Sequence, residues 1–285
     1  MGKTVGIIGL GLIGGSFSKT IRKSTDARIL GLDIDSQTID SALEDGAIDG
    51  ILDRGVLGTC DYLVVALRPG DAIRWMQDHI DDISKDCIIF DVGGVKRKIA
   101  DEIGALCSQR GRTFVGAHPM AGHHEGGYAH ATDSLFDGAS FLICEDDHTD
   151  EDAIRELSDF IKGLGFGQVV ITTPENHDEM IAFTSQLAHI VSSAYIKDPI
   201  AQRQGGYSAG SFQDMTRVAI LDAAMWSELC VENADMLIPH LDTLIEHLME
   251  YRQALDVCDR EELRTLLESG VEAKHSSIEA HKERS

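Results

Sequence analysis

A glycine-rich stretch near the N-terminus places the tightest constraint on the fold of this 285-residue chain. It runs Val5-Gly-Ile-Ile-Gly9-Leu-Gly11-Leu-Ile-Gly14, between an apolar strand candidate and a helical pattern over residues 12–22. In such a unit Gly9 permits the tight turn, Gly11 lets the backbone approach a pyrophosphate, and Gly14 lets helix and strand pack closely. The helix N-terminus then offers free N–H groups to the phosphates. The stretch therefore predicts a dinucleotide-binding unit.

An acidic residue indicates which dinucleotide binds. The second strand candidate, residues 28–33, ends at Asp33, 19 positions after Gly14. A carboxylate there accepts hydrogen bonds from the adenosine ribose and repels a 2′-phosphate, so we predict NAD rather than NADP. The predicted cofactor-binding residues are Gly9, Gly11, Leu12, Ile13, Gly14, Asp33 and Gly93.

The pattern of apolar and polar residues changes near residue 172. It predicts an α/β N-terminal domain over residues 1–172 and an all-helical domain over residues 173–285. In the first, short apolar runs alternate with helical stretches, which favours a parallel, doubly wound sheet. The runs cover residues 4–9, 28–33, 62–67, 87–91, 113–117, 140–144 and 168–172. In the second, a helix is expected to begin at Thr173-Pro174 and to continue to Ile196. Further on, leucines three and four apart form a helical stripe that suits either a core or a subunit interface.

Composition and charge exclude several classes of partner. The chain is 43% hydrophobic and carries a formal net charge of −23, which repels nucleic acid and anionic membrane surfaces. No apolar run approaches the ~20 residues of a membrane span. The six cysteines show no CxxC spacing, so we expect reduced thiols and a cytoplasmic location.

One histidine stands where a dinucleotide enzyme needs a proton acceptor. His118 closes an apolar strand candidate, and the carboxyl ends of parallel strands border the ligand site. A lone histidine is more often structural, but one beside a nicotinamide suits proton transfer. His123, His124 and Glu125 follow it without standard zinc spacing, so no metal is expected.

These motifs together resemble the prephenate/arogenate dehydrogenase family of tyrosine biosynthesis. The resemblance rests on the glycine fingerprint, DVGGVK at residues 91–96, HPMAG at 118–122, PENHD at 174–178, SQLAH at 185–189 and FQDMTR at 212–217. It implies a Rossmann-type domain with a helical dimerisation domain, hence a homodimer, and NAD-dependent oxidative decarboxylation of prephenate to 4-hydroxyphenylpyruvate, CO2 and NADH. It also implies that His118 is catalytic and that the substrate-binding residues are Arg217, His189, Ser185 and Trp226.

The chain departs from the family pattern at several positions. Many members carry a serine at the position of Gly94, and its hydroxyl contacts the catalytic histidine and the substrate. The orientation of His118 must then come from water or from another residue. Gln186 and Ala188 replace family-typical His and Pro, and the loop over residues 123–128 has a different polar set. We also expect the cations at residues 96–98 either to be solvated or to offset the negative field near the cleft.

Three alternatives stay open from the sequence. Arogenate dehydrogenase performs the same chemistry on the amino analogue of prephenate. A 3-hydroxyacid dehydrogenase shares the layout but usually employs a lysine on the long helix, where this chain has only Lys197 at the far end. A non-catalytic dinucleotide sensor would keep the glycines but would have no reason to bring His118 and Arg217 together.

Overall fold

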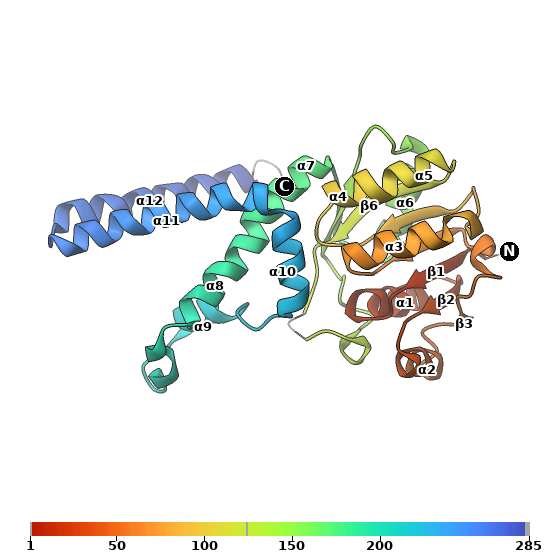
Figure 1. The fold of residues 1–285 in the computed structure, drawn as a ribbon. Helices are drawn as coiled ribbons and strands as arrows, with labels where there is room; N and C mark the ends of the chain where they lie inside the picture. Colours follow the sequence, from red (N-terminus) through yellow and green to blue (C-terminus); the bar gives the residue numbers. More distant parts are fainter. Residues whose placement is uncertain (1, 124, 283–285) are drawn as a thin grey trace. The chain divides into compact units, whose positions relative to one another are not determined.

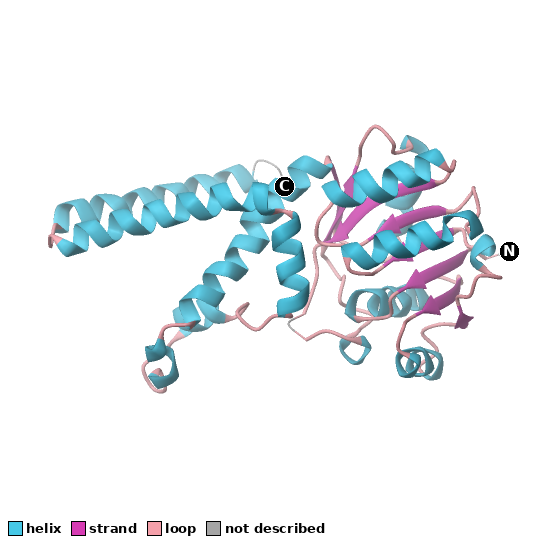
Figure 2. Ribbon diagram, in the orientation of Figure 1, coloured by secondary structure: helices cyan, strands magenta, loops and turns pink. Residues whose placement is uncertain are grey.

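The structure, a computed structural model, describes residues 2–123 and 125–282. The chain divides into two compact units, one reaching to Ala234 and one beginning at Asp235. The first unit holds a sheet with helices on both of its faces and a further group of helices, as Figure 2 shows. The second unit consists of two long helices.

A mixed sheet organises the first unit (Figure 1). Its strand order is β3-β2-β1-β4-β5-β6-β7-β8, and the strands from β3 to β6 pair in parallel. The strands are β1 (Thr4–Ile8), β2 (Arg28–Leu32), β3 (Gly50–Ile51), β4 (Tyr62–Val65), β5 (Ile88–Asp91), β6 (Thr113–Pro119), β7 (Ser140–Cys144) and β8 (Gln168–Thr172). The chain leaves β1 toward β2 and later returns to β4 on its other side, so the topological switch point lies between β1 and β4. Ligands of such sheets bind there, beyond the carboxyl ends of the strands.

Two features of the sheet were not predicted: one strand runs antiparallel, and one short strand is additional. β7 pairs antiparallel with β6, from Gly116 opposite Cys144 to Pro119 opposite Phe141, and then parallel with β8. The physical reason is the connection, because the described residues 120–123 and 125–139 contain a single 3₁₀ turn and no crossover helix that would return the chain for a parallel strand. The two-residue strand β3 was not predicted and extends the sheet at one edge.

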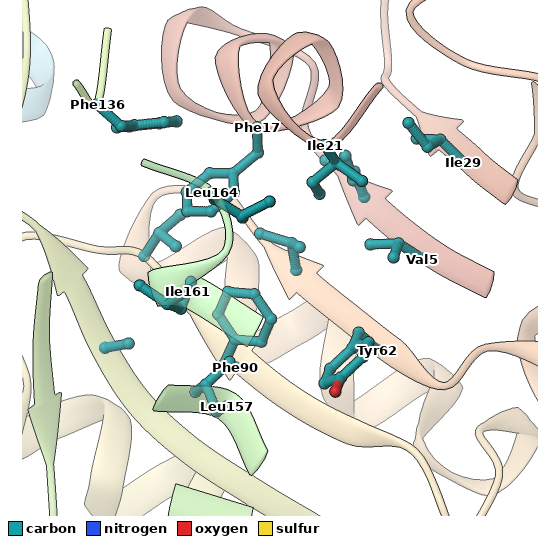
Figure 3. Packing of buried hydrophobic residues seen from close by; sticks show 14 of the residues in the cluster. Val5, Phe17, Ile21, Ile29, Tyr62, Phe90, Phe136, Leu157, Ile161 and Leu164 are labelled. Carbon is teal, nitrogen blue, oxygen red and sulfur yellow. The ribbon is translucent and has the colours of Figure 1, made fainter. Parts of the chain in front are cut away.

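Apolar side chains fill both faces of the sheet. Figure 3 shows one face, where Phe17 of α1 (Leu12–Ser24) packs with Phe90 of β5 and Phe136. On this face α6 (Glu151–Lys162) contributes Leu157 and Ile161. On the other, α3 (Pro69–His79), α4 (Arg97–Ile99) and α5 (Ala105–Gln109) cover a second cluster. Burial on both faces explains why the strands are continuous apolar runs without alternation.

The predicted long helix after β8 is present but changes its winding. Thr173 caps it by accepting a hydrogen bond from the Asn176 N–H at 3.2 Å, and Pro174 stands at its first position. It consists of α7 (Pro174–Ile181), the π-helical turn η5 (Ala182–Leu187) and α8 (Ala188–Ile196). The remaining helices of the first unit are α2 (Ser36–Glu44), α9 (Gly210–Thr216) and α10 (Ala223–Glu232), with a π-helical turn η3 (Ala100–Gly104) between α4 and α5.

The second unit is a pair of helices, α11 (Ala234–Asp256) and α12 (Arg260–Lys282). The Tyr251 hydroxyl on α11 donates to the Leu266 carbonyl on α12 at 3.1 Å. The predicted leucine stripe is helical, but Leu248 and Leu255 are 58% and 60% exposed. A core role therefore does not account for these two leucines.

Over residues 2–123 and 125–282, no helix is both long and apolar enough to span a bilayer.

Candidate active site

The glycine loop joins β1 to α1 at the switch point of the sheet. Gly9 has φ +83°, and a Cβ on it would lie 2.4 Å from the Ala66 carbonyl oxygen. A Cβ on Gly14 would lie 1.8 Å from the Gly9 carbonyl oxygen. The backbone therefore requires glycine at both positions. A Cβ on Gly11 would meet nothing within 4 Å, so the protein itself leaves open space beside the N-terminus of α1.

This open space fits the pyrophosphate of a dinucleotide. Gly11 is the N-cap of α1 and has no side chain with which to cap the helix. Leu12 and Ile13, in the first turn, are half-buried beside it. A helix N-terminus with first-turn N–H groups and no capping side chain attracts an anion.

Asp33 follows β2 and points back to the glycine loop. Its Oδ2 accepts from the Leu10 N–H at 2.7 Å, and its Oδ1 accepts from the Asp35 N–H at 3.0 Å. An ionised carboxylate has about four lone-pair sites, so these two bonds orient Asp33 and leave acceptor capacity. The side chain is half-exposed at the carboxyl end of β2.

A buried ion pair secures the strand that carries His118. Asp91 at the end of β5 and Lys96 are 2% and 1% exposed and form a salt bridge. Lys96 Nζ donates to the Ala117 carbonyl at 2.7 Å, and Asp91 Oδ1 accepts from the Ala117 N–H at 3.1 Å. Asp91 also accepts from the Gly93 N–H at 2.9 Å. The pair therefore holds both backbone polar groups of Ala117, the residue that precedes His118.

His118 lies near the carboxyl end of β6 and is only partly buried. Its Nδ1 is 2.9 Å from His177 Nε2, and His177 Nδ1 is 2.8 Å from Asp178 Oδ1. Burial, and then the neighbouring His177 and the Lys96 ammonium, lower the pKa of His118 well below its ordinary value. His118 is therefore neutral near pH 7 and can accept a proton.

Helix α10 closes the far side of this buried group. The Asn233 amide, fully buried, donates to the Asp178 carbonyl at 2.8 Å and to Gln186 Oε1 at 2.9 Å. Gln186 Nε2 donates in turn to the Leu229 carbonyl at 3.1 Å. A Cβ on Gly94 would lie 3.3 Å from Leu229 Cδ1, so the Gly94 loop passes close to α10.

The other predicted residues gather further along the long helix. The ring of His189 stacks on Trp226 with centroids 3.7 Å apart, and His189 Nδ1 is 2.9 Å from the Ser185 carbonyl. Burial lowers the pKa of His189, and the positive charge of Arg217 contributes. His189 follows His177 by 12 positions on the same long helix. The structure thus brings the rings of His189 and Trp226 into contact, with Ser185 one helical turn before His189 and with Arg217 near enough for its charge to act on His189.

The sequence left open whether the cations at residues 96–98 are solvated or offset the negative field near the cleft. Lys96 is buried against Asp91, Arg97 pairs with Asp178 at 3.2 Å, and Lys98 pairs with Glu232. Each positive charge therefore has a carboxylate partner. The interpretation of these residues as a solvated helix start is wrong for Lys96, which solvent does not reach, whereas its positive charge still acts on His118 and lowers the pKa of that residue.

The loop after β6 brings together three side chains of types that bind metal ions in other proteins. Ligand atoms of His123, Glu125 and His130 lie within 4.8 Å of one another. Within this loop the Glu125 N–H donates to His123 Nδ1 at 3.2 Å, and His130 Nδ1 lies 3.5 Å from Glu125 Oε2. His124 lies outside the described residues.

Sequence reasoning assigned no role to His177, which contacts His118, or to Asp178 and Asn233 behind it. His177 and Asp178 stand in the PENHD segment, and Asn233 follows α10. The available signal was the His-Asp pair in the polar segment with which the long helix begins. Its partner, His118, is 59 positions away, and no local pattern reports such a contact.

Comparisons with known proteins agree with this architecture. The sequence profile of the prephenate dehydrogenase nucleotide-binding domain matches residues 17–171, and that of the prephenate dehydrogenase dimerization domain matches residues 173–269. Prephenate dehydrogenase of Bacillus subtilis (strain 168) is 31% identical over 275 residues, which cover 92% of this chain and 73% of that protein.

Two solved structures are similar along almost the whole chain. Prephenate dehydrogenase from Aquifex aeolicus, in complex with hydroxyphenyl propionate and NAD+, superposes with a TM-score of 0.83 at 26% identity, covering 98% of this chain and 99% of that one. Arogenate dehydrogenase from Synechocystis superposes with a TM-score of 0.79 at 25% identity, covering 96% and 99%. With both domain profiles matched in order, the chain belongs to the prephenate dehydrogenase family.

Proposed function

We propose that this NAD-dependent oxidoreductase converts prephenate to 4-hydroxyphenylpyruvate and CO2, with His118 as the general base. The observation that carries the proposal is a neutral, partly exposed imidazole near the carboxyl end of β6. That end lies on the same edge of the sheet as the glycine loop after β1, because β1 and the strands β4 to β6 run in parallel. A dinucleotide on the loop and a substrate beside His118 would therefore share one site.

NAD is proposed to bind along the glycine loop and to accept a hydride there. The open space at Gly11 supports a pyrophosphate at the first turn of α1, beside Leu12 and Ile13. The half-exposed carboxylate of Asp33 suits the ribose hydroxyls and repels a 2′-phosphate. Gly93, held by Asp91, is proposed to border the nicotinamide end.

His118 manages the proton of the substrate. As the hydride leaves the hydroxyl-bearing ring carbon, the hydroxyl proton moves to the imidazole and a ketone forms. The bond to the ring carboxylate then breaks, CO2 leaves, and the bonding electrons pass through the diene to the oxygen. His118 can return its proton to the resulting phenolate. General base catalysis of this kind typically contributes ~10²–10⁴-fold.

Arg217, His189, Ser185 and Trp226 are proposed to bind the substrate. Arg217 is exposed and forms no ion pair within residues 2–123 and 125–282, so its guanidinium can receive a carboxylate through two parallel N–H bonds. The stacked His189 and Trp226 rings offer a flat, partly apolar wall beside it. Positioning by such groups lowers the barrier without further chemistry from the protein.

We further propose that two chains associate through the helical half. The profile matched at residues 173–269 describes a dimerization domain. Helices α11 and α12 also expose apolar side chains that a partner can cover: Ile245, Leu248, Met249, Leu255, Leu267 and Val271. Sedimentation of the full chain tests this, since a monomer at micromolar concentration contradicts it. The six free cysteines support the predicted cytoplasmic location, which stays a proposal.

A side-by-side assay tests the reaction. The purified chain is mixed with NAD and either prephenate or arogenate, and NADH and CO2 are both measured. We expect NADH and CO2 in equal amounts from prephenate. Turnover of arogenate alone favours the alternative that the Synechocystis structure represents. NADH without CO2 indicates a simple hydroxyacid dehydrogenase, and binding of NAD without turnover indicates a sensor.

A further inference from the structure

The buried pair His177 and Asp178 has no role in the reaction as written above. Both residues are 1% exposed, on α7. Together with His118 they form a line of hydrogen bonds, with 2.9 Å from His118 Nδ1 to His177 Nε2 and 2.8 Å from His177 Nδ1 to Asp178 Oδ1. In such a line each proton position constrains the next.

Asp178 fixes one end of the line as an acceptor. It receives the Lys96 N–H at 2.8 Å, the Arg97 N–H at 3.0 Å and the Arg97 Nε at 3.2 Å. Burial opposes the charge, but hydrogen bonds from His177 and from these backbone groups lower the pKa of Asp178 overall. An ionised carboxylate surrounded by donors can only accept. The proton between Asp178 and His177 therefore resides on His177 Nδ1.

That assignment decides the state of the second ring nitrogen. Burial lowers the pKa of His177, so the ring is neutral near pH 7 and carries one proton. With this proton on Nδ1, His177 Nε2 is an acceptor. The neighbouring atom, His118 Nδ1, must then donate. His118 consequently keeps its own proton on Nδ1 and presents an unprotonated Nε2.

We propose that His177 and Asp178 are positioning residues that hold His118 in the Nδ1–H tautomer and so make Nε2 the base of the reaction. This inference rests on the proposed function of His118. It also answers the departure at Gly94, where many family members have a serine whose hydroxyl contacts this histidine. Here the orientation of the ring comes from α7.

The same line stabilises the product of proton transfer. Once Nε2 is protonated, His118 is a cation whose Nδ1–H still donates to His177, with the Asp178 carboxylate beyond. The ionisable groups around His118 are His177 and Asp178 from α7, and the buried Lys96 and Asp91 from the segment at β5. Lys96 disfavours the cation, and the carboxylate at the end of the line offsets this.

Two amide substitutions of His177 separate positioning from packing. A glutamine oxygen reaches the place of Nε2 and can still accept from His118, whereas an asparagine oxygen reaches only the place of Nδ1. We expect His177→Gln to keep kcat within about threefold, and His177→Asn to lower kcat by about 10²-fold at unchanged KM for prephenate. In a His118→Ala background, His177→Asn should cause no further loss. Glu179→Gln, an exposed change on the same helix, is the matched control and should match the wild type.

Nitrogen-15 NMR of the histidine rings tests the tautomer without substrate. In the full-length wild type at pH 7.5, we expect His118 to show a protonated Nδ1 and an unprotonated Nε2, and His177 to be neutral. In His177→Asn we expect Nε2–H to become populated. A wild-type His118 protonated on Nε2, or a doubly protonated His177, overturns the inference even if prephenate is turned over. A correct tautomer without prephenate turnover instead contradicts only the proposed function.

The kinetic comparison of the His177 variants can also contradict the proposal. Equal kcat in the glutamine and asparagine variants, with equal melting temperatures, would mean that His177 only packs. If the asparagine variant does not fold, the wild-type spectrum and the glutamine variant still decide, because an Nε2-protonated His118 in either one overturns the proposal.

Discussion

The candidate site has two groups of side chains, one around His118 and one around His189. They differ in how many of their polar and charged groups already have partners within the protein. Around His118, the side chains of Asp91, Lys96, His177 and Asp178 are buried and hydrogen-bonded to one another or to the backbone. Around His189, Arg217 is exposed and without an ion pair in the described chain, and Trp226 is half-buried.

This difference suggests that the group around His118 serves the reaction and that the group around His189 and Arg217 serves substrate binding. A buried, fully paired group has its geometry fixed by folding, because any unpaired member would cost free energy. An exposed group with unused donors gains its partners only from a ligand. Changes in the first group should therefore act on kcat and stability, and changes in the second on KM.

Replacing His118 is expected to have the largest effect. His118→Asn removes the proton acceptor but keeps a small polar side chain near the Nδ1 position. We expect kcat to fall by about 10²–10⁴-fold with little change in KM for prephenate. Steady-state kinetics over pH 5–9 provide the measurement. Wild-type activity should persist well below pH 6.5 before it declines, because the base must be neutral and its pKa is lowered. A variant with near-normal kcat at its optimal pH contradicts the base assignment.

Breaking the buried ion pair of Asp91 and Lys96 should have the second largest effect, a decrease in the free energy of unfolding. Lys96→Met leaves the Asp91 carboxylate buried without its cation, which costs about 3–5 kcal/mol of unfolding free energy. Urea unfolding measures this. Lys98→Met is the matched control, because Lys98 is 44% exposed in its pair with Glu232 and should lose at most ~1 kcal/mol. Equal losses in the two variants would show that burial does not distinguish the pairs.

The sequence allowed prediction of the features that local chemistry encodes. The glycine loop, Asp33 and the seven longer strands depend on residues adjacent in the chain, and Thr173 caps the predicted helix. The predicted direction of β7 was wrong because that direction depends on the connection before it, where residues 120–123 and 125–139 form no crossover helix. The apolar residues of a strand do not indicate whether a crossover helix precedes it.

The buried polar contacts could not be predicted for a different reason. Lys96 in a row of three cations is typical of a solvated helix start, and only the folded sheet brings Asp91 and the Ala117 carbonyl around its ammonium. His177 and His118 meet because α7 follows β8, which pairs with β7 and lies one strand beyond β6 on the side away from β5. Pairing of this kind depends on topology rather than on spacing in the chain.

Removing the exposed cation should have a smaller and different effect. Arg217→Ala deletes the proposed carboxylate receptor, and we expect KM for prephenate to rise by about 10–100-fold with kcat within threefold. Melting temperature should not change, because Arg217 has no ion pair to lose in the described chain. Arg203→Ala, another exposed arginine of the helical half, is the control and should leave KM unchanged. A fall in kcat with constant KM would place Arg217 with the chemical group instead.

The smallest predicted effect is the pH dependence of stability, which again sets the buried group apart. The pKa values of His118 and His177 are lowered in the folded chain from the ordinary value of 6.5. Below that pH the unfolded chain binds more protons than the folded one, so the unfolding free energy decreases as pH falls. Each histidine contributes a slope of at most ~1.4 kcal/mol per pH unit. Urea unfolding between pH 7.5 and 5 measures the slope, and His177→Gln should reduce it, whereas Arg217→Ala should not. A slope unaffected by His177→Gln would mean that other groups, and not this buried pair, carry the linkage.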